Sequence, residues 1–191
     1  MYMYTGRKRV FAYKEVVLAA FFRWRTGMYS VGDKIVYPMH GAGVIESIEE
    51  KEFLGQKQDY YILKMPLGDM RVMIPTHNVV NIGIRGIINI DEIDGVLEVL
   101  KDQSVNINTN WNKRYRENMV KIKSGSIYEV ADVVRSLMLR EKNKGLSTGE
   151  RKMLSSAKQI LISELVLAKG TDQLDIEVII DECINLNETV D

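Results

Sequence analysis

Lys34-Ile35-Val36-Tyr37-Pro38 is a short run of β-forming residues that ends at a proline. His40-Gly41-Ala42-Gly43 follows as a turn cluster, and Val44-Ile45-Glu46-Ser47-Ile48-Glu49 then returns to the strand pattern. Two strands joined by a tight turn predict an antiparallel hairpin. This hairpin decides the fold of the first part of the chain.

Further strands follow the hairpin at short intervals. A turn at residues 54–57 leads to a predicted third strand at residues 59–65, and Gly68-Asp69 is a hairpin signal before a fourth strand at residues 70–75. Residues 79–82 predict a short fifth strand. Five strands in so short a span predict a small, strongly bent barrel of the SH3 or Tudor kind.

The pattern becomes helical after Arg85-Gly86. We expect helices at residues 91–101, at about 110–123 with Thr109 or Asn110 as the cap, and from Val130 to Lys144. Ser147-Thr148-Gly149-Glu150 is a capping box that opens the next helix, and a last helix is expected at about 172–185.

These elements predict an α+β fold made of two parts. An N-terminal small Tudor/SH3-like β-barrel is expected at residues 28–86. A C-terminal bundle of four or five α-helices is expected at residues 87–187, followed by a tail at residues 188–191.

Residues 1–27 differ from the rest of the chain. They carry six basic groups and one acidic group, and Lys14 and Glu15 interrupt their apolar run. That interruption does not fit a signal peptide, and a basic amphipathic helix on a membrane surface is an alternative. We expect an upstream start or a weakly ordered extension, with Met28 opening the folded protein.

The composition excludes several classes of protein. Cys183 is the single cysteine, which excludes an internal disulfide and a Cys-cluster zinc site and fits a cytoplasmic setting. No stretch approaches the roughly 20 apolar residues of a membrane span. His40 and His77 stand in separate turns without a second ligand at metal spacing. We therefore expect no enzyme, and no metal, cofactor, membrane or small-molecule substrate as a partner. Cys183 is interpreted as a buried structural thiol.

One of the two tryptophans, Trp111, lies in Asn108-Thr109-Asn110-Trp111-Asn112-Lys113-Arg114-Tyr115-Arg116. Amides and cations around an indole favour a surface that contacts nucleic acid, where the ring stacks on an unpaired base or wedges into a distorted step. The alternative is a tryptophan that packs the bundle against the barrel. Composition alone leaves both interpretations open.

Cations gather at two predicted helix starts, where they are slightly unfavourable for the helix itself. The candidates for DNA binding are Trp111, Lys113, Arg114, Arg116, Arg151 and Lys152. Residues 107–169 carry thirteen Lys and Arg against six Asp and Glu, whereas residues 170–191 carry none against seven. Phosphates would supply the missing negative charge, which predicts salt-sensitive binding of weak sequence specificity. The alternative is that these charges only form the solvated faces of surface helices.

The barrel offers a second candidate surface. Small barrels bind proteins at a sheet edge by strand addition, and the candidates here are Lys51, Glu52, Phe53, Arg71 and Met73. The alternative is ordinary strand and turn surface. An RNA-binding barrel is disfavoured, because residues 28–86 carry six basic and seven acidic groups.

Three separated motifs resemble one protein family. Residues 31–45, VGDKIVYPMHGAGVI, resemble the opening of the CarD-type bacterial transcription regulators, which share their barrel with the transcription-repair coupling factor. Residues 109–116 and 145–154 resemble the helical domain specific to CarD proteins. The resemblance runs from Met28 to about Asn185, and the extension before Met28 lies outside the family pattern.

The resemblance implies a non-enzymatic regulator of transcription. Its barrel would bind the β subunit of RNA polymerase, and its helical domain would bind promoter DNA at the upstream edge of the bubble. A tryptophan that matches Trp111 would enter the minor groove and keep the bubble from closing, so that the open complex persists. Cations that match Lys113, Arg116 and Arg151 would contact phosphates.

The same resemblance implies polymerase contacts near Lys51, Phe53, Arg71 and Met73. The family pattern has arginine where this chain has Lys51 and Met73, which changes the ionic character of that contact. A barrel-plus-helix protein adaptor without nucleic-acid binding is the alternative function.

Overall fold

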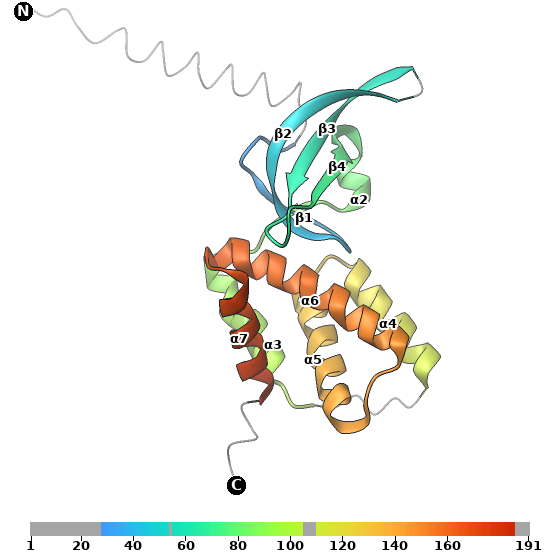
Figure 1. Cartoon of the computed structure of the whole chain (residues 1–191), viewed down its shortest axis with the longest axis vertical. Helices are drawn as coiled ribbons and strands as arrows, with labels where there is room; N and C mark the ends of the chain where they lie inside the picture. The colour runs from blue at the N-terminus through green and yellow to red at the C-terminus, as the bar shows by residue number, and fades with distance from the viewer. Residues whose placement is uncertain (1–27, 54, 105–109, 186–191) are drawn as a thin grey trace, which may run out of the picture.

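The computed structural model describes residues 28–53, 55–104 and 110–185. A curved sheet forms one end of the molecule and a group of helices forms the other, and α6 lies at the junction between them (Figure 1). The predicted extension at residues 1–27, the cap candidate Thr109 and the tail at 188–191 lie outside the described residues.

The sheet is antiparallel, with the strand order β4-β3-β2-β1-β5. Its strands are β1 (Lys34–Tyr37), β2 (Gly41–Phe53), β3 (Gln56–Lys64), β4 (Arg71–Pro75) and β5 (Arg85–Gly86). The register between β2 and β3 shifts between Ile45 and Ser47, and an irregularity of this kind bends a strand. Ile35, Tyr61, Leu63 and Ile74 are fully buried inside the curve. The predicted α+β fold with a Tudor-like sheet is confirmed.

The predicted fifth strand at residues 79–82 is wrong. Those residues form the short helix α2 (Val79–Ile82), which follows the 3-10 turn η1 (Thr76–Asn78). Val79 is buried in the barrel core, and the amide of Ile84 donates to the carbonyl of Val79 across Gly83, whose φ is 80°. The β-branched valines favour a strand locally, but the left-handed glycine and a buried side chain stabilise a helical turn. The fifth strand is β5, paired with β1.

Five α-helices and a 3-10 turn follow the sheet in the described part of the chain. They are η2 (Ile90–Glu92), α3 (Ile93–Lys101), α4 (Trp111–Lys123), α5 (Ile127–Lys144), α6 (Thr148–Lys169) and α7 (Gln173–Asn185). Asn110 caps α4, Ser147 and Glu150 form the predicted capping box of α6, and Gly145 ends α5. The predicted helical bundle is confirmed.

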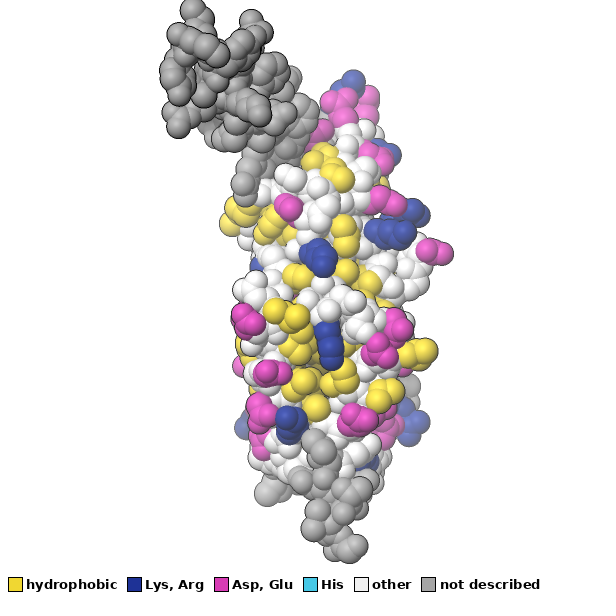
Figure 2. All heavy atoms as spheres, turned by 90° about the vertical axis from the view of Figure 1, so that its left-hand side faces the viewer, with side chains coloured by type: hydrophobic (Ala, Val, Ile, Leu, Met, Phe, Trp, Pro, Cys, Tyr) yellow, Lys and Arg dark blue, Asp and Glu magenta, His cyan; other side chains and the backbone are white. Residues whose placement is uncertain are grey.

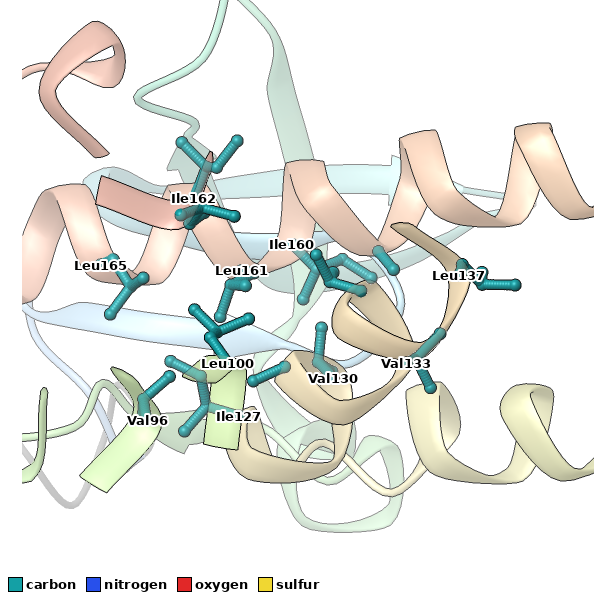
Figure 3. Packing of buried hydrophobic residues seen from close by; sticks show 14 of the residues in the cluster. Val96, Leu100, Ile127, Val130, Val133, Leu137, Ile160, Leu161, Ile162 and Leu165 are labelled. Carbon is teal, nitrogen blue, oxygen red and sulfur yellow. The ribbon is translucent and has the colours of Figure 1, made fainter. Parts of the chain in front are cut away.

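The helices share one apolar core. Figure 3 shows Leu100 of α3, Ile127 and Val130 of α5 and Leu161 of α6 converging in the space between these helices. Residues 160–165 of α6 are all buried, so this part of the helix is covered on every side. A helix buried all round belongs to the interior of a fold, and here it has the other helices on one side and the sheet on another.

The junction between sheet and helices is polar and buried. Ser163 Oγ accepts a hydrogen bond of 2.8 Å from the amide of Ala42, the residue after Gly41 in β2. Glu164, which is 1% exposed, accepts two hydrogen bonds of 2.6 and 2.8 Å from Arg85 and one of 3.0 Å from the amide of Ile88. These contacts hold the two parts of the chain in one orientation.

Candidate nucleic-acid interface

Trp111 is the first residue of α4, and Asn110 caps this helix by accepting a hydrogen bond of 3.2 Å from the amide of Lys113. The indole stacks on Tyr115 one turn later, with 5.4 Å between ring centroids and 30° between ring planes. The indole N–H donates to Ser147 Oγ over 3.0 Å. The Trp111 residue stays 41% exposed. The ring is therefore held on one side and open to a ligand on the other.

The alternative in which Trp111 packs the bundle against the barrel is wrong. The ring contacts Tyr115 of α4, and Ser147 and Gly149 at the start of α6. The starts of α4 and α6 lie side by side at the lower right of Figure 1, away from the sheet. The ring thus belongs to an outer edge of the helical part.

Four of the predicted cations are exposed on α4 and α6, the helices that hold this ring. The side chains of Lys113 and Arg151 are 61% and 66% exposed, and Arg116 and Lys152 are also exposed. Lys113 approaches Glu117 only to 3.8 Å, and Arg151 approaches Glu141 only to 3.9 Å. Ion pairs this loose and exposed contribute little, so these cations can exchange their partners for phosphates.

Arg114 is a correction to the predicted set of DNA-binding residues. It is 9% exposed, and its Nη2 donates to Glu150 Oε1 over 2.9 Å. A buried guanidinium that pairs with a carboxylate inside the protein is not placed to bind a phosphate. The prediction treated the three cations after Trp111 alike, because the sequence does not show which side of this helix packs against its neighbour.

Two opposing influences act on the pKa of Glu150. It is 3% exposed, and burial by itself raises the pKa of a carboxyl group. Hydrogen bonds from Arg114 and Ser147 outweigh that burial and hold the pKa of Glu150 below its ordinary value. The carboxylate is therefore ionised beneath Trp111 at neutral pH.

Ser147, Gly149 and Tyr115 are site residues that the sequence prediction missed. The capping box identified Ser147 and Glu150 as helix-start residues, but nothing in their spacing showed that they meet Trp111, 36 residues away from Ser147. The one available signal was the Tyr four residues after Trp111, since residues at that spacing meet on one helix face.

An open groove of about 570 Å³ runs along α4 beside this edge. Lys113 and Arg116 line it, together with Glu117, Val120, Lys121 and Glu129. Val120 is 69% exposed, so an apolar side chain lies between the cations. The groove extends the basic surface away from Trp111 along the helix.

The face of the helical part that carries α7 is acidic. Helix α7 contains no Lys or Arg and carries Asp175, Glu177, Asp181 and Glu182. Figure 2 views the side of the molecule that α3 and α7 occupy, and acidic side chains flank a hydrophobic strip there without a continuous basic patch. The exposed cations predicted to bind DNA thus lie on α4 and α6, whereas α7 is acidic.

The barrel candidates fall into two groups. Met73 of β4 is 50% exposed on the terminal strand of the sheet, and Arg71 of β4 pairs with Glu46 at 2.6 Å. Met73 pairs with Ile62 of β3, and Ile62 pairs with Ser47 of β2, so Met73 and Ser47 lie at the same level of the sheet. Lys51 lies four residues farther along β2 than Ser47, a distance of about 13 Å. Lys51 and Glu52 therefore lie toward the β2–β3 turn, away from Met73. The side chain of Phe53 lies outside the described residues.

No group of three or more metal-ligating side chains occurs among residues 28–53, 55–104 and 110–185. Cys183 is buried in the helical core, and that burial raises the pKa of its thiol. The prediction of a buried structural thiol is confirmed. Within the same ranges, no helix is long and apolar enough to span a membrane.

Comparisons with known proteins match both parts of this chain. Residues 29–88 match the CarD-like/TRCF RID domain, and residues 95–181 match the CarD C-terminal domain. The chain is 45% identical over 150 residues to the protein named "Putative transcription factor YdeB" of Bacillus subtilis strain 168. That alignment covers 78% of this chain and 98% of the relative. The chain belongs to the CarD family of transcription regulators.

Proposed function

We propose that this regulator binds the β subunit of RNA polymerase through its barrel and promoter DNA through the edge formed by α4 and α6. Binding at the upstream edge of the transcription bubble stabilises the open complex. The observation that carries the proposal is the half-exposed Trp111, held between the starts of α4 and α6, the two helices that also carry four exposed cations.

The chemistry of this edge suits DNA whose bases are partly unstacked. An apolar wedge enters the minor groove between base steps and keeps them apart, while cations contact the phosphates on either side. Trp111 supplies the wedge, and Lys113, Arg116, Arg151 and Lys152 supply the cations. Contacts of this kind depend on DNA shape and charge, so sequence specificity is weak.

The barrel supplies the attachment to polymerase. Strand β4 ends the sheet order in the described chain, so its outer edge is available for strand addition by another protein. Met73 and Arg71 lie on that strand. Lys51, Glu52 and Phe53 lie farther out on β2 and would contact a different part of the same partner. The match to the CarD-like/TRCF RID domain supports an interaction with polymerase.

We assign residues 28–86 to the polymerase-binding domain, residues 87–187 to the DNA-binding domain, and residues 1–27 and 188–191 to an extension and a tail. Attachment to polymerase raises the local concentration of the helical domain at the promoter, so its own DNA affinity can stay low. A protein with these two partners acts in the cytoplasm.

The role of Trp111 can be tested by removing its ring. Trp111→Ala removes the wedge while the exposed cations remain, so open complexes should lose most of the added lifetime. A tenfold change corresponds to about 1.4 kcal/mol of differential binding, which one indole can supply. The measurement is the decay of promoter complexes of purified polymerase after a competitor is added.

Leu174→Ala is the matched control, because Leu174 is an apolar residue that is 71% exposed on α7. It should leave the lifetime unchanged, and both variants should still co-purify with the polymerase β subunit. A Trp111→Ala protein that prolongs open complexes as the unmodified protein does would refute the proposal. It would then favour the adaptor without nucleic-acid binding.

A further inference from the structure

Two matching contacts join the starts of α4 and α6. Trp111 Nε1 donates to Ser147 Oγ over 3.0 Å, and Arg114 Nη2 donates to Glu150 Oε1 over 2.9 Å. The partners are three residues apart on each helix, so the first turns of the two helices lie side by side in the same direction. The residue that would wedge into DNA and the buried arginine are thus held by one capping box.

The hydroxyl of Ser147 has its hydrogen-bonding capacity fully used. Its one proton goes to Glu150 Oε2 over 2.9 Å. Its oxygen accepts from the amide of Glu150 over 3.3 Å and from Trp111 Nε1 over 3.0 Å. A hydroxyl has one donor and two lone pairs, so once the proton is committed to Glu150, a lone pair must face the indole.

Glu150 is itself held from both oxygens. Oε1 accepts from Arg114 and lies 3.5 Å from Arg140 Nε, while Oε2 accepts from the amide and the hydroxyl of Ser147. The residue is 3% exposed. A buried carboxylate with this set of donors does not rotate freely, and its fixed direction fixes the proton of Ser147 in turn.

The indole is confined on two further sides. Tyr115 stacks on the ring at a centroid distance of 5.4 Å. Gly149 lies against its edge, since a Cβ at Gly149 would be 3.5 Å from Trp111 Cζ2. The ring therefore has a defined orientation in the free protein, with its remaining surface exposed.

We propose that Ser147, Glu150 and Arg114 are positioning residues that orient Trp111 for DNA before the DNA is bound. This inference rests on the proposed function of Trp111. A tryptophan that rotated freely would lose side-chain freedom on binding, and an oriented one avoids that cost. The buried pair contacts no DNA itself and acts through the hydroxyl of Ser147.

The test uses Ser147→Ala, with Ser147→Thr as the conservative variant, in the full-length protein with Trp24→Phe so that Trp111 gives the only indole signal. In the Ser147→Ala protein, the indole N–H should exchange with solvent faster. The open-complex lifetime should shorten by about threefold, as expected for one lost hydrogen bond. Ser147→Thr should restore both, because threonine keeps the hydroxyl and the cap.

Trp111→Phe separates positioning from general loss of stability, since phenylalanine keeps a ring but has no N–H. In that background, Ser147→Ala should not shorten the open-complex lifetime further. An unchanged indole exchange rate in Ser147→Ala, or an equal further loss in the Trp111→Phe background, would overturn the positioning role. If Trp111→Ala itself leaves the lifetime unchanged, the proposed function fails. The exchange measurement still decides whether Ser147 holds the ring.

Discussion

At the scale of single residues, neighbouring cations of one helix lie in different surroundings. Lys113 and Arg116 are exposed, whereas Arg114 between them is buried against Glu150. A helix turns by 100° per residue, so adjacent positions face different surroundings. A variant of Arg114 should therefore act through stability and the orientation of Trp111, and variants of its neighbours should act through charge.

Charge reversal at Arg151 or Lys113 should weaken promoter binding and make it less sensitive to salt. Each lost phosphate contact lowers the slope of log affinity against log salt by about 0.9, because fewer counterions are released. The measurement is DNA binding by Arg151→Glu and Lys113→Glu at several salt concentrations.

Lys57→Glu is the control for this series, because the Lys57 side chain is 64% exposed on the barrel, away from the α4 and α6 edge. Its slope should equal that of the unmodified protein. Equal slopes for all three variants would show that phosphates are bound elsewhere.

At the scale of elements, β4 is the strand through which we propose that the barrel binds its partner. It is five residues long and ends the sheet order, and Met73 projects from it with 50% exposure. Met73→Glu should reduce binding to the polymerase β subunit by at least tenfold, because a desolvated, unpaired charge at an interface costs well over about 1.4 kcal/mol. Pull-down or calorimetry with the β subunit measures this.

Val80→Glu is the comparison for that experiment, since Val80 is 71% exposed on α2 of the same barrel. Both variants should melt close to the temperature of the unmodified protein, because neither side chain is buried. If Met73→Glu binds polymerase as well as Val80→Glu does, the contact lies near Lys51 and Glu52 or on another face.

Helix α6 links the two candidate surfaces. Its start carries Ser147 and Glu150 against Trp111, and its buried middle carries Ser163 and Glu164 against the sheet. A helix of 22 residues is stiff over this length, about 33 Å. The barrel and Trp111 are therefore held at a constant separation.

At the scale of the whole molecule, Glu164 is one of the residues of α6 that join the helices to the sheet. Glu164→Ala removes the carboxylate partner of Arg85, whose guanidinium keeps its hydrogen bonds to the carbonyls of Gly86 and Gly125, and it removes the acceptor of the buried Ile88 amide. Loss of one member of such a pair costs about 2–4 kcal/mol, given that the Arg85 side chain is 32% exposed. Thermal unfolding should shift downward and separate into two transitions.

Glu98→Ala is the control for the junction, since the Glu98 side chain is 70% exposed on α3. The Glu164→Ala protein should still bind the polymerase β subunit, but it should prolong open complexes less, because the wedge is no longer held at one distance from the barrel. A single transition at the original temperature would show that the junction does not depend on this pair.

Much of this architecture is predictable from local sequence. The strands around the Gly-rich turn, the five helices and the caps at Asn110 and Ser147 follow from periodicity and from backbone donors that need partners. The strand predicted at residues 79–82 failed because Gly83 and a buried Val79 outweighed the β preference of two valines. Local preferences are worth tenths of a kcal/mol, and burial is worth several times more.

The sequence by itself determined the two-part α+β fold, the cluster of cations near Trp111 and the motifs of the CarD family. Only the tertiary structure decided which of those cations are exposed, that Trp111 rests on the capping box of α6, and that Ser163 and Glu164 join the two parts. These pairs lie 36 residues apart for Trp111 and Ser147 and 79 residues apart for Arg85 and Glu164. Contacts at such separations arise from packing of complete helices, and local spacing does not encode them.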